Sequence, residues 1–350
     1  MTLGPLMIDI GGTELTATDR ELLAHPLIGS VILFTRNYVE PAQLRTLTAQ
    51  IQSIRNPSLL IAVDHEGGRV QRFRTGFSAL PPLRRIGQLY DADAQQGLAM
   101  ARALGWLMAA ELLACGLDFS FAPCVDLDYG LSEIIGDRAF NASAGVVAPL
   151  AIASMHGMRD AGMAATAKHF PGHGAVVADS HLALPVDRRE LVDLSEDLLP
   201  YRRLIASGLP AVMVAHVLYP AIDAVPASFS ERWITQVLRQ ELRFGGLVFA
   251  DDLTMAGAAT VGDLHARAER ALAAGCDVLP VCNDRAGVER LLGELKAQPD
   301  AASQLRLIRM RGRKQLNFET LITSPAWRSA REWLQRSAAK PELKFEPGGA

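Results

Sequence analysis

The chain has 350 residues, of which 49% are hydrophobic and 21% are charged, a composition typical of a globular protein with a large core. Its formal net charge of -3 provides no general basic field, so we expect no nucleic-acid partner. We interpret the short basic clusters, Arg84-Arg85 and Arg309-Arg311-Arg313-Lys314, as solvated surface.

The four cysteines lack the CxxC spacing of zinc or redox motifs, and we expect small buried side chains in a reducing compartment: Cys115, Cys124, Cys276 and Cys282. The first residues lack the basic region and long apolar stretch of a signal peptide. We find no apolar run of membrane-spanning length; residues 209–217, for example, have the length of a strand. We therefore expect a cytoplasmic protein that does not contact a membrane.

Short aliphatic or β-branched runs alternate along the chain with longer segments of helical periodicity. In chain order the pattern predicts strands 5–10 and 31–34, helix 41–54, strand 59–63, helix 95–115, strand 119–122, helix 142–161, strand 164–168, helix 195–207, strand 211–215, helix 231–244, strand 247–250, helix 265–274, strand 278–281 and helix 285–297. Glycine, which ends helices readily, follows four of these helices, as Gly116, Gly162, Gly208 and Gly275.

Apolar strands separated by helices indicate a parallel sheet covered by helices. Eight such strands favour a single closed (β/α)₈ barrel of the TIM type over an open doubly wound sheet. Gly11-Gly12 follows the first strand but lacks the rest of a dinucleotide-binding motif. We predict one α/β catalytic domain over residues 1–335, with one or two outer helices after residue 300, and a flexible tail over 336–350.

Polar residues follow the predicted strands, at the barrel end where active sites lie. They are Asp64-His65-Glu66, Asp126, Asp128, Arg138, Lys168-His169, His216, Asp251-Asp252 and Asn283-Asp284. A charged residue directly after a buried strand is costly unless it is paired or functional. The convergence of so many on one face indicates an enzyme.

Several of these residues allow two interpretations. Asp64 and Arg72 either bind a ligand or form a structural ion pair that holds their loop. Lys168 and His169 are consecutive, so both reach the site only if their strand is interrupted there. His216 belongs either to the core or to the site.

Two pairs of residues suit covalent and acid–base catalysis. Asp251 and Asp252 are adjacent at a strand end, so we expect only one to point inward, where a fixed carboxylate could act as a nucleophile. Asp179 and His181 lie on a glycine-rich loop, where the carboxylate could orient the imidazole for proton transfer. Alternatively, Asp179 only stabilises a turn.

A metal site is a further alternative. His169 and His173, completed by His181 and Asp251, could surround a metal ion as in barrel metallohydrolases. Their spacing matches no recognised metal motif, and neighbouring glycines favour a mobile loop. We therefore expect no metal.

Four segments in this order resemble the bacterial β-N-acetylhexosaminidases of glycoside hydrolase family 3, a group that acts in peptidoglycan recycling. They are VDHEGGRVQRF (63–73), IIGDRAF (134–140), AKHFPGHG with DSH (167–174 and 179–181) and FADDLTM (249–255). The string KHFPGHG…DSH is highly specific, and the resemblance spans residues 5–335. One departure is Ala250, where the family usually has serine before the nucleophile.

The resemblance implies a retaining mechanism in which Asp251 attacks the anomeric carbon and His181, oriented by Asp179, is the acid/base. Most retaining glycosidases use two carboxylates instead. The resemblance also implies sugar contacts from Asp64, Arg72, Arg138, Lys168 and His169.

The reaction that the resemblance implies is hydrolysis of β-1,4-linked N-acetylglucosamine from 1,6-anhydro-N-acetylmuramic acid, with or without a peptide. It implies a cytoplasmic role in cell-wall recycling, and through it in cell shape, cell cycle and cell division. We expect a monomer without a metal or organic cofactor. The alternatives are a phosphorylase that uses phosphate in place of water, a metal-dependent barrel hydrolase, and a sugar-binding protein that has lost catalysis.

Overall fold

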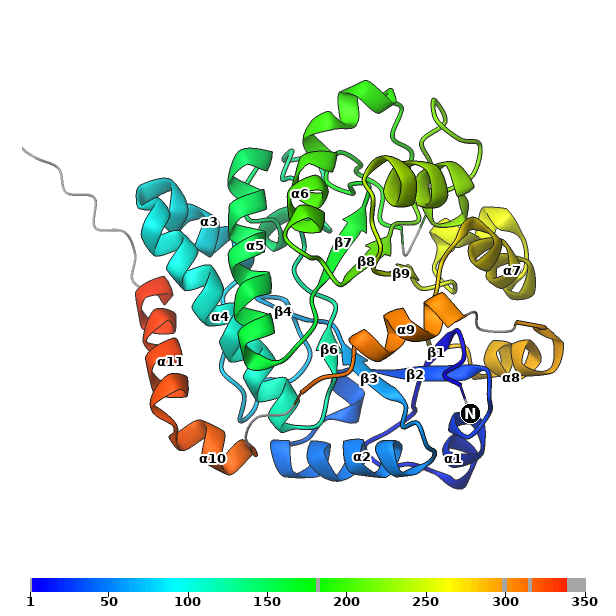
Figure 1. Ribbon diagram of the computed structural model, residues 1–350, viewed down its shortest axis with the longest axis horizontal. Coiled ribbons are helices and arrows are strands. Elements are labelled where there is room, and N and C mark those ends of the chain that lie inside the picture. Colours follow the sequence, from blue (N-terminus) through cyan, green and yellow to red (C-terminus); the bar gives the residue numbers. More distant parts are fainter. Residues whose placement is uncertain (1, 181–182, 298–300, 314–316, 339–350) are drawn as a thin grey trace, which may run out of the picture.

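The structure is a computed structural model that describes residues 2–180, 183–297, 301–313 and 317–338. Eight parallel strands form its centre, and each overlaps one of the eight predicted strands (Figure 1). They are β1 (Leu6–Asp9), β2 (Ile28–Leu33), β3 (Leu60–Val63), β6 (Phe119–Ser120), β7 (Thr166–Phe170), β8 (Ala211–Val214), β9 (Leu247–Ala250) and β10 (Leu279–Val281). The prediction of an α/β fold with a parallel sheet is therefore confirmed.

The strands are arranged in two hydrogen-bonded groups, in the orders β10-β1-β2-β3-β6 and β7-β8-β9. Isolated parallel bridges, Cys124 to Lys168 and Phe249 to Val278, lie where the two groups meet. Aromatic side chains from distant parts of the chain fill the space between the groups. The Phe249 ring lies 5.0 Å from that of Phe121 and 5.6 Å from that of Phe119.

Seven helices overlap the seven predicted ones, with boundaries that differ by a few residues. They are α2 (Pro41–Ser53), α4 (Ala94–Ala114), α5 (Ala144–Ala161), α6 (Ser195–Ala206), the π-helix η5 (Arg232–Glu241), α7 (Leu264–Ala274) and α8 (Arg285–Glu294). The four glycines predicted to end helices all have positive φ, including 100° at Gly162 and 110° at Gly275. The four cysteines are buried, as predicted, and none of them forms a disulfide bond.

Helix α4 corrects the prediction that no apolar run is long enough for a membrane. By length and composition it could cross one, but 67% of its most apolar window is buried within the protein. It packs against α5 at very short distance: a Cβ at Gly157 would lie 2.0 Å from the carbonyl oxygen of Arg102. An all-round apolar helix that is enclosed by its neighbours is a core helix.

Several elements were not predicted. They are helices α1 (Ala17–Leu23) and α3 (Leu83–Ala92), the hairpin of β4 (His65–Gly67) and β5 (Val70–Gln71), and the short 3-10 helices η1 (Thr35–Asn37), η2 (Gly136–Arg138), η3 (Leu191–Leu194), η4 (Ala227–Phe229) and η6 (Ala256–Val261). Periodicity needs a longer window than most of these provide. After residue 300 there are three helices in place of one or two: α9 (Ala301–Arg309), α10 (Phe318–Thr323) and α11 (Pro325–Ala338). Most of the predicted tail, residues 339–350, lies outside the described residues.

Candidate active site

A cavity of about 370 Å³ opens at the carboxyl ends of the parallel strands. Seven of the eight site residues predicted from the sequence line it, namely Asp64, Arg72, Arg138, Lys168, His169, Asp179 and Asp251. The eighth, His181, lies outside the described residues. The structure thus brings together side chains from strand β7 and from the segments that follow β3, β5, β6, β7 and β9.

Lys168 is the centre of a buried charge network. Its Nζ atom lies 2.7 Å from Asp64 Oδ1 and 2.6 Å from Glu66 Oε1. Burial alone would lower the pKa of Lys168, but the two carboxylates outweigh it and raise that pKa above its ordinary value. Lys168 therefore stays cationic within the cavity wall.

Glu66, like Asp126 below, was noted after its strand in the sequence but was not assigned to the site. Arg138 holds it with two parallel hydrogen bonds, Nε to Oε2 at 2.9 Å and Nη2 to Oε1 at 2.8 Å. Burial alone would raise the pKa of Glu66, but the charges of Arg138 and Lys168 hold it well below the usual range. The available signal was its place in the string Asp64-His65-Glu66, two residues after the strand-end aspartate. Glu66 thus binds both Lys168 and Arg138. Its paired hydrogen bonds with Arg138 form the bidentate geometry in which arginine and carboxylate bind most strongly.

Both Lys168 and His169 reach the cavity, although neighbouring strand residues normally point in opposite directions. The register between β7 and β8 shifts between Ala167 and Phe170, so the alternation is interrupted at this point. The interruption that the sequence analysis required for joint access is therefore present.

Asp126 orients His169 from behind. Its Oδ2 atom lies 2.7 Å from His169 Nδ1, and its Oδ1 accepts a 2.7 Å hydrogen bond from the backbone N–H of His173. Burial opposes ionisation of Asp126, but His169 and His173 lower its pKa to about 2. When His169 Nδ1–H donates to Asp126, the other ring nitrogen, Nε2, faces Arg138, whose Nη2 atom is 3.4 Å away. Asp126 had been noted after its strand but not assigned to the site.

One group of potential metal ligands occurs in the described part of the chain: Cys124, Asp126 and His169, with ligand atoms within 4.8 Å of one another. It differs from the metal shell considered in the sequence analysis. Its atoms already bind each other, since Cys124 Sγ donates to Asp126 Oδ2 at 3.2 Å. Burial also raises the pKa of the Cys124 thiol well above its ordinary value, which disfavours the thiolate that metals bind. Hydrogen bonding accounts for this cluster.

Arg72 lines the cavity without forming the ion pair with Asp64 that the sequence allowed, because Asp64 binds Lys168. The Nε atom of Arg72 is buried and has no hydrogen-bond partner among the described residues. Its guanidinium lies 5.9 Å from the ring centre of Phe34. Arg72 is therefore a cation that a bound ligand could satisfy.

Asp251 and Asp252 both line the cavity, and the expectation that only one of them points inward stays a prediction. Strand β9 ends at Ala250, and its alternation does not extend to these residues. Their environments nevertheless differ. Asp252 accepts hydrogen bonds from Thr254 and from the backbone N–H of Cys282, and burial raises its pKa to about 6. Asp251 Oδ1 accepts a 2.9 Å hydrogen bond from the backbone N–H of Asp252.

The glycine-rich loop after β7 reaches the cavity through His173, Asp179 and Ser180. His173 Nε2 lies 3.2 Å from Ser180 Oγ, and Gly257 donates its backbone N–H to the Ser180 carbonyl at 2.8 Å. His216 does not line the cavity. It is fully buried and stacks on Phe229, which assigns it to the core.

Comparisons with known proteins identify the family of this chain. The sequence model described as the glycosyl hydrolase family 3 N terminal domain matches residues 6–311. A protein named beta-hexosaminidase from Thioalkalivibrio sulfidiphilus is 54% identical over 99% of this chain and 100% of its own length. NagZ from Neisseria gonorrhoeae, solved with N-trifluoroacetyl-D-glucosamine, is 41% identical, with a TM-score of 0.91 over 97% of this chain and 99% of that one. A family 3 β-N-acetylglucosaminidase from Paenibacillus is 32% identical, with a TM-score of 0.83 over 95% of this chain and 67% of that one.

Proposed function

This chain belongs to glycosyl hydrolase family 3 and is a β-N-acetylglucosaminidase, and from that premise we propose how it acts and on what. The proposed reaction is the release of terminal N-acetylglucosamine from a 1,6-anhydro-N-acetylmuramic acid unit, with retention of anomeric configuration. The observation that carries the proposal is the single cavity in which Asp251, Asp179 and a network of fixed charges meet.

Asp251 is the proposed nucleophile. Its backbone N–H donates a 3.0 Å hydrogen bond to the Val214 carbonyl, and its Oδ1 accepts one from the backbone N–H of Asp252. The Asp252 carboxylate, in contrast, is capped by Thr254 and by the backbone N–H of Cys282. In the first step a carboxylate oxygen bonds to the anomeric carbon as the bond to the leaving oxygen breaks. In the second step water displaces Asp251 and returns the sugar with its original configuration.

His181 is the proposed acid/base, with Asp179 as its orienting partner. In the first step its imidazolium gives a proton to the leaving oxygen, and in the second the neutral ring takes one from water. Support comes from Asp179 and Ser180, which line the cavity directly before His181. The Ser180 carbonyl is itself anchored by the backbone N–H of Gly257.

Sugar binding is the proposed role of Asp64, Arg72, Arg138, Lys168 and His169. Glu66 and Asp126 act behind them as positioning residues, because each fixes donors that face the cavity. Preorganised donors strengthen transition-state binding without moving during the reaction. The complex of the Neisseria NagZ with N-trifluoroacetyl-D-glucosamine supports a sugar with an acylated amino group as the ligand here.

The proposed substrate is a small muropeptide or disaccharide, acted on in the cytoplasm by a monomer as part of peptidoglycan recycling, and so linked to cell shape and division. The cavity, about 370 Å³, is at the small end of the range for ligand sites, which favours one enclosed sugar over a long polysaccharide. We also propose that the eight strands close into a complete (β/α)₈ barrel over residues 1–335, with the two isolated bridges at its seams.

The test is to follow hydrolysis of an aryl β-N-acetylglucosaminide and of the proposed disaccharide by proton NMR. We expect the β-anomer of N-acetylglucosamine to appear first, with a rate that is unchanged by phosphate. First formation of the α-anomer would contradict the retaining mechanism. Production of a sugar phosphate in phosphate buffer would favour the phosphorylase, and loss of activity with a chelator would favour the metal-dependent hydrolase.

A further inference from the structure

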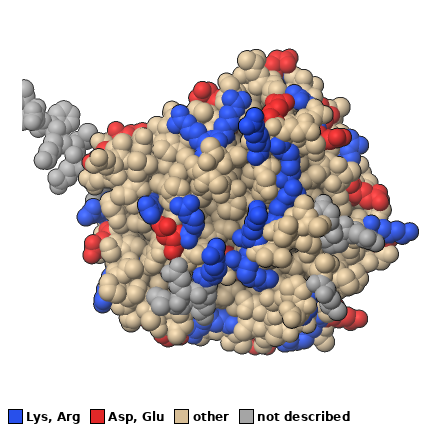
Figure 2. Space-filling model, in the orientation of Figure 1, with Lys and Arg blue, Asp and Glu red and all other residues tan. Residues whose placement is uncertain are grey.

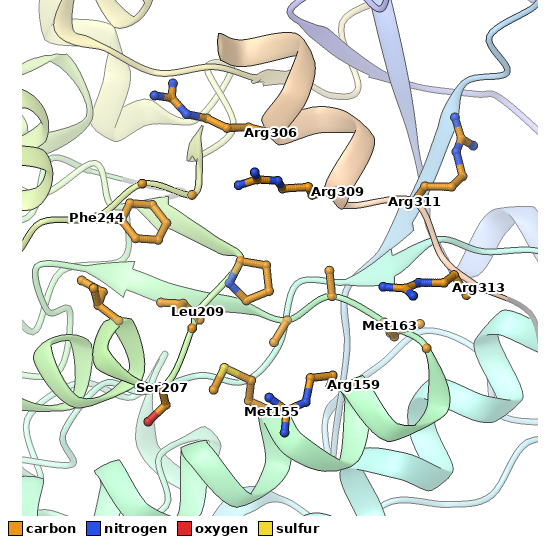
Figure 3. Close-up of a pocket in the computed structure, with 18 of the residues that line it drawn as sticks. Met155, Arg159, Met163, Ser207, Leu209, Phe244, Arg306, Arg309, Arg311 and Arg313 are labelled. Carbon is orange, nitrogen blue, oxygen red and sulfur yellow. The ribbon is translucent and has the colours of Figure 1, made fainter.

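A second cavity, of about 470 Å³, lies at the opposite ends of the strands from the candidate active site. Residues that directly precede β7, β8 and β9 line it, including Ala165, Pro210 and Gly246. Helix α9 and the extended segment after it form its other side (Figure 3). The cavity is therefore separate from the site described above.

Six arginines line this cavity, and no aspartate or glutamate is among its described lining residues: Arg159, Arg243, Arg306, Arg309, Arg311 and Arg313. Such a set is unusual in a chain with a net charge of -3. Figure 2 shows basic side chains running across the middle of the face on which α9 lies, with acidic side chains mostly toward its edge. Arg309, Arg311 and Arg313 were expected to be solvated surface, but the fold places Arg159 and Arg243, from two distant segments, in the same cavity.

The chain geometry explains how the arginines gather. Arg306 and Arg309 are three residues apart on α9 and so share a helix face. Arg309, Arg311 and Arg313 then follow at intervals of two, through a turn and an extended segment. Figure 3 shows Arg309 and Arg313 extending into the cavity from this side, opposite Arg159 of α5.

Two of the six arginines are structural. Arg306 binds Asp277 at 2.9 Å, and Arg311 binds Asp118 at 3.3 Å and turns away from the cavity in Figure 3. Within the described ranges the other four, Arg159, Arg243, Arg309 and Arg313, make no side-chain hydrogen bond or ion pair. All four are exposed, so an anion that enters this concavity meets several guanidinium groups and no carboxylate of the described lining.

The wall near Arg243 is built and held in place. Arg243 has φ of 58°, a left-handed conformation that is unfavourable for a non-glycine residue and persists only where the surrounding structure holds it. Arg239, outside the cavity, donates hydrogen bonds to the carbonyls of Phe244 and Gly246 and pairs with Asp277 at 2.8 Å. Asp277 thus ties this loop to α9 through Arg239 and Arg306.

The floor of the cavity is apolar. Met155, Met163, Leu209 and Phe244 contribute to it, and all four are buried. Guanidinium groups bind phosphate oxygens in pairs of parallel hydrogen bonds, and a cavity of this size matches a small organic molecule. We propose that this cavity binds a small organic polyphosphate, of the nucleoside di- or triphosphate class, with its phosphates on the free arginines and its organic part on the apolar floor.

The test is calorimetric titration of the full chain with three probes: adenosine triphosphate, inorganic triphosphate and adenosine, in a phosphate-free buffer with saturating N-acetylglucosamine. We expect adenosine triphosphate to bind saturably and more tightly than inorganic triphosphate, and adenosine alone not to bind. In R309A/R313A we expect affinity to fall by at least about tenfold, because two charged contacts are lost. The matched control is R328A, since Arg328 is an exposed arginine on α11 outside this cavity.

Hydrolysis of an aryl N-acetylglucosaminide by R309A/R313A should equal that of the wild type, which shows that the variant is folded. The proposal is overturned if adenosine triphosphate does not bind saturably at millimolar concentration, or if R309A/R313A binds it as the wild type does. Equal affinity for the two triphosphates would also overturn it. So would binding of only an oligonucleotide or an anionic vesicle, because the partner would then be a macromolecule.

Discussion

The two ends of the strands carry cavities of similar size but opposite electrostatic design. At the carboxyl ends, Lys168 and Arg138 are each paired with buried carboxylates. At the amino ends, six arginines line a cavity whose described lining has no acidic residue, and two of them pair with aspartates outside it. The first arrangement suits a neutral sugar on which charge develops during a reaction, whereas the second suits a ligand that brings its own negative charge.

The largest expected effect concerns proton transfer in the first cavity. His181→Ala should reduce turnover of a disaccharide by roughly 10²–10⁴-fold, because the leaving oxygen then receives no proton. With an acidic phenol as leaving group the glycosyl-enzyme should still form quickly, and azide should accelerate its breakdown. Steady-state and burst kinetics measure both effects.

Asp179→Ala should show the same dependence on the leaving group, whereas R309A/R313A should show none. Equal losses for good and poor leaving groups, without rescue by azide, would remove His181 and Asp179 from acid/base catalysis. Their loop would then have only a binding role.

The next prediction compares the loss of Lys168, which is paired with two carboxylates, with the loss of Arg72, whose Nε atom has no partner among the described residues. Arg72→Ala should lower kcat/KM on the order of 10²-fold with little change in unfolding free energy, because the Nε atom of Arg72 lacks a protein partner. Lys168→Ala should cause a similar kinetic loss and also destabilise the fold, since it leaves Asp64 and Glu66 without their shared cation. Kinetics combined with urea denaturation distinguish the two; equal stability of the variants would contradict the pairing argument.

Acid should destabilise the fold through His65, which lies in β4 beside Glu66. Burial and nearby arginines lower the pKa of His65 from 6.5 to about 3, so its neutral form is favoured in the folded chain. The stabilisation is complete above about pH 6.5 and is lost as the pH falls toward 3. Between pH 6.5 and 4 this loss is on the order of 3 kcal/mol.

Urea denaturation of wild type and His65→Gln at several pH values measures this contribution. The variant should lose less stability on acidification, while R309A/R313A should follow the wild type, because arginine does not titrate in this range. Parallel pH curves for wild type and His65→Gln would show that His65 does not contribute.

The smallest effect concerns salt. Raising sodium chloride from 0.05 to 0.5 M should change kcat/KM for an aryl β-N-acetylglucosaminide by less than about threefold, because buried ion pairs are screened little and this substrate is uncharged. Adenosine triphosphate binding at the arginine cavity should weaken by an order of magnitude or more over the same range. Similar salt dependence at both cavities would remove the electrostatic distinction between them.

The sequence allowed the strands and most helices to be predicted because each has the apolar periodicity of a buried element. Helix α1 and the β4–β5 hairpin are too short for such a signal. Helix α4 was correctly predicted as a helix. Its burial could not be predicted, because α5 and α11, which are distant in the sequence, cover its apolar surface.

For the site, residues that follow strands could be predicted because a parallel fold gathers strand ends. The partners of those residues were harder to predict. Glu66 binds Lys168 and Arg138, which are both distant from it in the sequence. Asp126 binds His169, which lies in β7 where the register of that strand is interrupted. Arg159 and Arg243 give no sequence signal at all, because only the fold brings them to the segment after α9.

The central claim is that Asp251 forms a covalent bond to the sugar, and trapping that species tests it most directly. A slow fluorinated N-acetylglucosaminide should inactivate the enzyme, and peptide mass spectrometry should place one sugar residue on Asp251. Asp252, whose carboxylate is held by Thr254 and the Cys282 backbone, should remain unmodified. A sugar found on Asp252, or full turnover without any adduct together with an α-anomeric first product, would contradict the account.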